Sequence, residues 1–276
     1  MKKYLSRFSF LFPTILIVAS VLVPLFAPQA ALEQNVEAMM QGPSWQHWFG
    51  TDYLGRDLFF RTLLGARVSL TIGLVTCIAT LVIGFIYGAI AGWSEGLVDR
   101  VLMRLNDIFL SIPSFILVAV ICLSLQLVMT TMDAQLRGVI CLCVAISASH
   151  WMGIARVTRG MVQEVKRKSF VEAAIALGGT RTHILVRHVL PNILSTLLVL
   201  TALQIPSSIL YESFMSFIGL GVQPPLTSWG LLIKEGWKTL SSFPHLLLFP
   251  SFILFLTVWS FHQLIDDLRA SPSHPK

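Results

Sequence analysis

Six stretches of this chain are apolar over roughly the length that crosses a lipid bilayer. They cover about residues 8–26, 68–91, 108–129, 138–154, 193–219 and 246–265, each near the ~20 residues that a bilayer-spanning helix needs. No water is present inside a bilayer to pair backbone N–H and C=O groups, so an apolar segment that crosses it alone must be an α-helix. The sequence therefore predicts an all-α integral membrane protein with six transmembrane helices.

Composition supports the same class. Hydrophobic residues make up 55% of the 276 positions and charged residues 12%, whereas soluble globular proteins have about 45–50% and about 25%. The amino terminus, with Lys2, Lys3 and Arg7 before an apolar run, has features of a secretory signal. We expect it to be retained as the first span, because its removal would leave the two ends of the chain on opposite sides of the membrane.

The basic residues indicate the orientation of the spans. If the amino terminus is cytosolic, 14 of the 20 Lys and Arg residues fall in inside segments. Those that fall outside are Arg56, Arg61, Arg67, Arg137, Lys234 and Lys238. Because Lys and Arg are enriched in cytoplasmic loops, this division places both termini in the cytosol.

A polar segment at residues 170–191 lies between the fourth and fifth apolar stretches, on the predicted cytosolic side. Its first half consists of good helix formers. Gly178 can adopt the left-handed conformation that ends a helix, Thr180 can cap a second helix, and Pro191 is expected to end that second helix. The segment therefore predicts a helix, a tight turn and a helix. Short connections to spans at both ends argue against the free helix-turn-helix domain that nucleic-acid binding would need.

The same segment resembles the EAA loop of the membrane subunits of ABC importers. The matching residues are Glu172, Ala173, Ala174, Gly178, Leu190 and Pro191. His188 departs from the family pattern, which usually has an apolar residue two positions before the Leu-Pro pair. In that family the loop forms cytosolic coupling helices that sit in a cleft of the ATPase. The resemblance implies a type I ABC importer transmembrane fold, with these residues as the ATPase-coupling loop.

Two further regions resemble the peptide and nickel branch of these permeases. The matching sequences are HWFGTDYLGRD at 47–57, GARVSL at 65–70, SFIGLGVQPP at 216–225 and SWG at 228–230. Arg104, Asp107 and Pro113 also match, so the resemblance runs over roughly residues 47 to 269.

The first of these regions alternates acidic and basic residues. Its glycines break the chain into turns, and we expect internal ion pairs of Asp52 or Asp57 with Arg56 or Arg61. Such pairs would hold the outer loop against the span, although direct contact with the cargo is an alternative.

No sequence motif for catalysis or metal binding is present. The chain lacks the G-x-x-x-x-G-K-[ST] phosphate loop, so ATP and magnesium should be bound by partner ATPase subunits. The seven His and four Cys residues have no spacing typical of a metal site or of a catalytic group. We therefore expect no catalytic, cofactor or metal residues, and a chain that is not itself an enzyme.

Polar and small residues within the spans mark two helix faces. Gln204, Ser208 and Glu212 are spaced by four and so share one side of a helix, where a carboxylate needs water or a partner. We expect this face to line the translocation path, with a structural hydrogen-bonding role for Glu212 as the alternative. The second face is a stripe of glycines, Gly84, Gly88 and Gly92, which should let another helix pack closely.

The sequence thus predicts a permease subunit of an ATP-driven importer in a bacterial inner membrane, with di- or oligopeptides as cargo. The resemblance implies a second, related permease, two cytosolic ABC ATPase subunits and a periplasmic substrate-binding protein as partners. Nickel or another metal chelate is an alternative cargo. A secondary transporter or channel working alone is an alternative class, against which stand the lack of an inverted repeat and the few ionisable residues within the spans.

The expected organisation has three parts. An amino-terminal span and outer loop occupy residues 1–67, and the transmembrane domain occupies 68–269 with its coupling segment at about 156–191. A cytosolic tail follows at 270–276.

Overall fold

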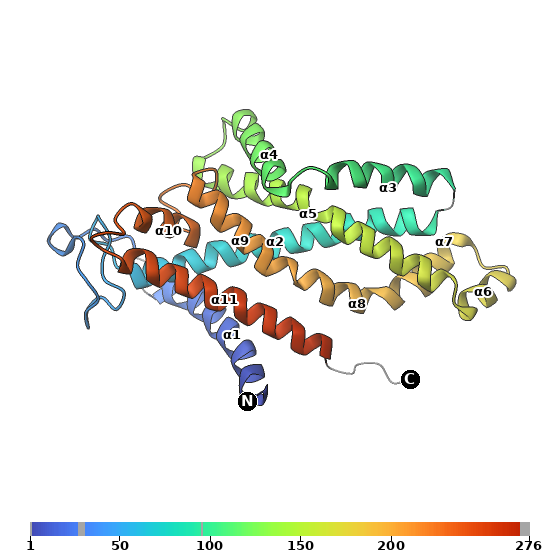
Figure 1. The fold of residues 1–276 in the computed structure, drawn as a ribbon, viewed down its shortest axis with the longest axis horizontal. Coiled ribbons are helices and arrows are strands. Elements are labelled where there is room, and N and C mark those ends of the chain that lie inside the picture. The colour runs from blue at the N-terminus through green and yellow to red at the C-terminus, as the bar shows by residue number, and fades with distance from the viewer. Residues whose placement is uncertain (1, 27–30, 95, 271–276) are drawn as a thin grey trace.

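The computed structural model of the protein describes residues 2–26, 31–94 and 96–270, and its regular structure is helical (Figure 1). The α-helices are α1 (Lys2–Phe26), α2 (Leu58–Trp93), α3 (Leu97–Leu110), α4 (Ser114–Val128), α5 (Ala134–Lys166), α6 (Ser169–Ala176), α7 (Arg181–Ile184), α8 (Leu190–Ala202), α9 (Gln204–Ile218), α10 (Trp229–Trp237) and α11 (His245–Ala270). Two short elements are the 3-10 turn η1 (Val36–Ala38) and the π-helical turn η2 (Leu185–Val189).

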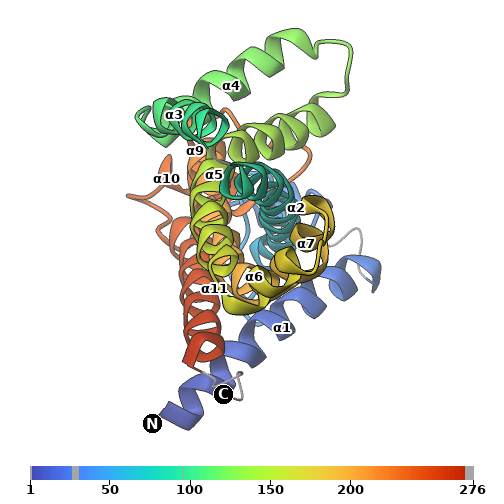
Figure 2. The ribbon, with the colours of Figure 1, turned by 90° about the vertical axis from the view of Figure 1, so that its right-hand side faces the viewer.

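The helices form an elongated bundle around α2 and α5, which run side by side (Figure 1). Helices α1 and α11 pack together along one flank, and α3 and α4 lie along the other (Figure 2). The loop 31–57 and α10 lie at one end of the bundle, whereas α6 and α7 lie at the opposite end (Figure 1). The two regions singled out by sequence are therefore far apart.

The all-helical membrane fold is confirmed, but the structure does not reproduce the six spans one by one. Within the described residues, four helical segments are long and apolar enough to cross a bilayer: Leu58–Trp93, Ala134–Lys166, Arg181–Ile218 and His245–Asp267. Helices α3 and α4 would make a fifth span only as a pair bent by 89°. The apolar part of α1, Phe10–Val23, is a shorter helix. The count of six remains a prediction.

The predicted third span, residues 108–129, is wrong as a single helix. Helix α3 ends at Leu110, and α4 begins at Ser114. Pro113 occupies the position before α4, where its missing N–H costs no helical hydrogen bond, and proline disfavours helical geometry in the residue before it. The apolar run is continuous, but the backbone turns within it.

The predicted glycine stripe packs as expected. A Cβ atom at Gly84 would lie 2.8 Å from the backbone oxygen of Trp151, and one at Gly92 would lie 2.8 Å from that of Arg159, both on α5. A Cβ at Gly88 would overlap the backbone oxygen of Ala155. The stripe therefore lets the backbones of α2 and α5 approach more closely than any side chain would allow.

The ion pairs predicted for the loop 31–57 are confirmed. The carboxylate of Asp52 pairs with Arg56 at 2.7 Å and with Arg61 at 2.5 Å. Arg61 also contacts Glu235 of α10 at 2.8 Å, a partner that the sequence did not indicate. Asp57 instead caps the start of α2, accepting hydrogen bonds from backbone N–H groups, and pairs with His47 at 2.8 Å. The loop is thus tied to α2, and Arg61 of α2 links this network to α10.

We predict that Gly88→Ala destabilises the protein by about 1–3 kcal/mol, because the added methyl group forces α2 away from α5. Gly160→Ala is the matched control, since a Cβ there meets no atom within 4 Å. It should be neutral or stabilising by about 0.5–1 kcal/mol through helix propensity. The measurement is the free energy of unfolding in mixed micelles. Equal stabilities of the two variants would contradict the close α2–α5 contact.

Candidate functional site

The hairpin of α6 and α7 has the turn that its sequence predicts. Helix α6 ends at Ala176, and Gly178 adopts a left-handed conformation with φ of +84°. The N–H of Gly179 donates to the backbone oxygen of Ala174 at 3.1 Å. The hydroxyl of Thr180 caps α7 by accepting from the N–H of His183 at 3.4 Å. Both the helix end at Gly178 and the cap at Thr180 are confirmed.

The expectation that Pro191 ends the second helix is wrong. Helical structure continues from α7 through the π-turn η2 into α8, in which Pro191 occupies the first turn. A proline inside a helix normally clashes with the carbonyl four residues earlier and cannot donate to it. The wider π-turn comes directly before this proline, and such turns are common where the regular hydrogen-bond ladder is interrupted. The coupling segment is therefore continuous with a predicted span.

One face of the hairpin is fixed to the bundle. Val171 of α6 and Ile184 of α7 are 0% and 1% exposed, and they belong to an apolar cluster with residues of α2, α5 and α8. Figure 2, which faces this end of the molecule, shows α6 and α7 beside the end of α5. Burial of these side chains holds the short helices in place, because helices of this length are not stable alone.

The other face of the hairpin is apolar and open. Phe170, Ile175 and Leu177 are 41%, 52% and 88% exposed. Of the predicted coupling residues, Glu172, Ala173, Gly178 and Pro191 are exposed, and Ala174 and Leu190 are partly buried against the apolar cluster. A short segment that buries one apolar face and presents another has the form of a docking element.

A polar cavity of about 390 Å³ borders the hairpin, with Glu172 and Lys166 among its lining residues. Asp99 of α3, on its wall, receives two hydrogen bonds of 2.5 Å from the guanidinium of Arg159 on α5. This bidentate pair fixes the start of α3 to α5 near the hairpin. The sequence did not single it out, since its two residues are 60 positions apart.

The residues predicted to line a path lie on α9, and two of them are buried inside this chain. Glu212 is 0% exposed and Ser208 is 1% exposed, while Gln204 is partly buried. No hydrogen-bond partner of the Ser208 hydroxyl is found among the described residues. The side chains of Glu212 and Ser208 therefore face other helices of the same subunit.

The Glu212 carboxylate is held by hydroxyl groups. It accepts hydrogen bonds from Ser69 of α2 at 2.6 Å, from Ser216 at 2.8 Å and from Ser213 at 3.4 Å. Two of these hydroxyls also accept from backbone N–H groups, Ser69 from that of Trp229 and Ser216 from that of Val222. We call Glu212 and these three serines the Glu212 cluster. The cluster ties α9 to α2 and to the segment before α10. These contacts are those expected if Glu212 has a structural hydrogen-bonding role. That Glu212 lines the translocation path remains a prediction.

Comparison with known proteins places these features in a family. The family described as "Binding-protein-dependent transport system inner membrane component" matches residues 84–267, more than half of the chain. The chain is similar to the oligopeptide transport system permease protein OppC of Haemophilus influenzae, at 38% identity over 92% of this chain and 79% of that protein. It is also 37% identical to the dipeptide transport system permease protein DppC of Bacillus subtilis, over 92% and 77%.

A glutathione transport system permease protein, GsiD of Pectobacterium atrosepticum, is 35% identical over 85% of this chain and 75% of that protein. Among solved structures, a chain of the inward-facing MetNI methionine ABC transporter matches with a TM-score of 0.59 and 19% identity, over 76% of this chain and 94% of that one. That likeness confirms the fold of an ABC importer's transmembrane subunit. By sequence and by fold, the chain belongs to the binding-protein-dependent transport system inner membrane components, the membrane-spanning permeases of ABC importers.

Proposed function

We propose that this chain forms half of the translocation path of an ATP-driven importer of short peptides. The observation that carries the proposal is the hairpin of α6 and α7, fixed on one face and apolar on the other, at the end of a membrane bundle. The relatives named for oligopeptides, dipeptides and glutathione support a peptide cargo, since glutathione is itself a tripeptide. Nickel or another metal chelate is the alternative cargo within the same family.

The partners follow from this role. A second, related permease would complete the path, and a periplasmic binding protein would deliver the cargo to the end that carries the loop 31–57 and α10. Two ATPase subunits would bind ATP and magnesium and would hydrolyse the nucleotide, so this chain needs no catalytic residue. One ATPase would cover the apolar residues of the hairpin. When ATP binds, the ATPase would move, and α6 would pass this movement to α5 and α8.

The proposed orientation places both termini in the cytosol of a bacterium. A reporter fused after Lys168, between α5 and α6, should behave as cytosolic. Fusions after Met40 and after Pro225, in segments at the opposite end of the bundle, should behave as external (Figure 1). Paired fluorescent-protein and alkaline-phosphatase fusions measure this. A cytosolic signal from the Pro225 fusion would contradict the orientation and the six spans.

Coupling is tested at the turn of the hairpin. Gly178→Val should lower uptake of labelled peptides about tenfold, because a β-branched residue is strained by about 1–2 kcal/mol in the left-handed conformation. The strain should displace α6 and loosen the ATPase. Ala173→Arg should act similarly by placing bulk on the exposed face. Peptide uptake, ATP hydrolysis and retention of the ATPases on purification are the measurements, made in the complete transporter.

Two controls separate strain from bulk at the hairpin. Gly178→Asn should retain most activity, because asparagine tolerates a positive φ and a Cβ at this position meets no atom within 4 Å. Ala173→Ser should also be tolerated. Normal uptake by Gly178→Val and Ala173→Arg with the ATPases still bound would refute the coupling role. If the unaltered transporter takes up nickel and not peptides, the proposed peptide cargo is wrong and nickel is the cargo.

The path-lining role of Gln204, Ser208 and Glu212 needs α9 to change its packing during transport, since two of these side chains are now buried. We predict that Ser208→Cys and Glu212→Cys are protected from a water-soluble thiol reagent at rest and become reactive during ATP turnover. The background should lack the native cysteines, which are Cys77, Cys122, Cys141 and Cys143. Protection in every state would assign Glu212 to the hydrogen-bonding role alone.

A further inference from the structure

Arg67 of α2 is an exposed cation without a partner in the described part of the chain, where no ion pair or side-chain hydrogen bond reaches its guanidinium. It lies about 14 Å along α2 from Leu58, at a rise of about 1.5 Å per residue. Arg67 directly precedes the predicted span 68–91, in a helix that is long and apolar enough to cross a bilayer. A cation beside the hydrocarbon layer is stabilised by water or by an anion. Its surroundings therefore indicate what it binds.

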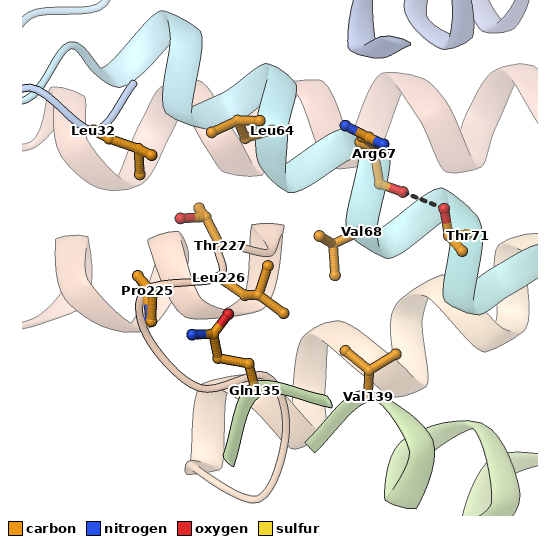
Figure 3. A pocket seen from close by; sticks show the side chains of 10 residues that line it. All are labelled: Leu32, Leu64, Arg67, Val68, Thr71, Gln135, Val139, Pro225, Leu226 and Thr227. Carbon is orange, nitrogen blue, oxygen red and sulfur yellow. Dashed lines mark hydrogen bonds between the residues drawn. The ribbon is translucent and has the colours of Figure 1, made fainter. Parts of the chain in front are cut away.

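Two cavities adjoin at Arg67. The larger, of about 570 Å³, lies between α2, the first residues of α5 and the segment 225–227 (Figure 3). Figure 3 shows Arg67 and Thr71 on α2 at one side of this cavity, with Gln135 and Val139 of α5 at the other. The smaller, of about 240 Å³, lies between α1, α2, α9 and α11. Arg67 and Thr71 line both.

The two cavities differ in depth. The larger one reaches the helix ends, since Gln135 lies in the first turn of α5 and 225–227 connects α9 to α10, and side chains from within α2 complete its wall. The smaller cavity is walled by side chains from within the helices, among them Ile17, Leu74 and Phe261. Arg67, with Thr71 beside it, thus lies between two apolar cavities, one that reaches the helix ends and one enclosed by the helices.

We propose that Arg67 binds the phosphate of an anionic phospholipid whose acyl chains occupy the two cavities. An arginine binds a phosphate through charge-assisted hydrogen bonds, and its planar guanidinium matches the geometry of phosphate oxygens. A lipid has one anionic group and two apolar chains, which matches one cation between two apolar cavities. This proposal does not rest on the identity of the cargo.

Other occupants fit less well. A peptide would bring backbone N–H and C=O groups, and the side chains that line the two cavities offer few polar partners for them. A helix of a second permease would fit only if it brought an anionic side chain to Arg67 as well as an apolar surface to both cavities. A phospholipid supplies both the anion and the apolar chains in one molecule.

The test is native mass spectrometry of the purified full chain titrated with phosphatidylglycerol. Arg67→Gln should weaken binding of this lipid about tenfold or more, through loss of the charge-assisted hydrogen bonds, and Arg67→Lys should weaken it less. Arg137→Gln is the matched control, since it removes the same charge from α5 near that end of the bundle and lines neither cavity. Phosphatidylcholine with the same acyl chains, and glycerol 3-phosphate, should both bind more weakly than phosphatidylglycerol.

A second pair of variants tests the acyl-chain site with the charge intact. Leu74→Trp fills the smaller cavity from a side chain that is 53% exposed, so the fold should tolerate it, and it should reduce lipid binding. Ile78→Trp, also 53% exposed and one turn further along α2, should not. Equal binding by Arg67→Gln and the unaltered chain, or glycerol 3-phosphate binding as tightly as the lipid, would overturn the proposal. So would a complex purified with Arg67→Gln that lacks the second permease, if the variant chain still binds phosphatidylglycerol as the unaltered chain does.

Discussion

The close contact between α2 and α5 is the constraint on which the rest of this fold depends. Three glycines spaced by four place the two backbones against each other, and each leaves no room for a Cβ atom. Within a bilayer the lipid tails are as apolar as the side chains, so helices gain little by burying apolar surface alone. They associate instead through tight van der Waals packing, which the glycines make possible. The two longest uninterrupted helices thereby form one stiff core.

This core carries the functional ends of the molecule. At one end, the ion pairs of Asp52, Arg56, Arg61 and Glu235 attach the loop 31–57 to α2 and α10. At the other end, α5 leads directly into the hairpin of α6 and α7, whose buried residues pack on α2, α5 and α8. The hairpin is therefore packed directly on helices that run the length of the bundle. The unbroken passage from α7 through η2 into α8 strengthens this connection.

Buried polar groups set the register between helices. The Glu212 carboxylate has hydroxyl donors on its own helix and on α2, and those hydroxyls in turn accept from backbone groups of the segment 221–229. Leaving such a carboxylate unpaired inside a membrane protein costs several kcal/mol, on the order of the translocon-insertion penalty. The cluster therefore favours a single arrangement of α2, α9 and α10.

The sequence by itself determined the local and compositional features. Apolar length and the shortage of charge defined a helical membrane protein, the spacing of glycines predicted a close helix contact, and Gly178 and Thr180 predicted the turn of the hairpin. Each depends on neighbouring residues or on a regular period along one helix. Only the tertiary structure decided that the third apolar stretch bends at Pro113 and that helical structure continues through Pro191, because the cost of a proline depends on the backbone around it. It alone brought Ser69 to Glu212, Glu235 to Arg61 and Arg159 to Asp99, because these pairs lie on different helices and their meeting depends on how the helices pack.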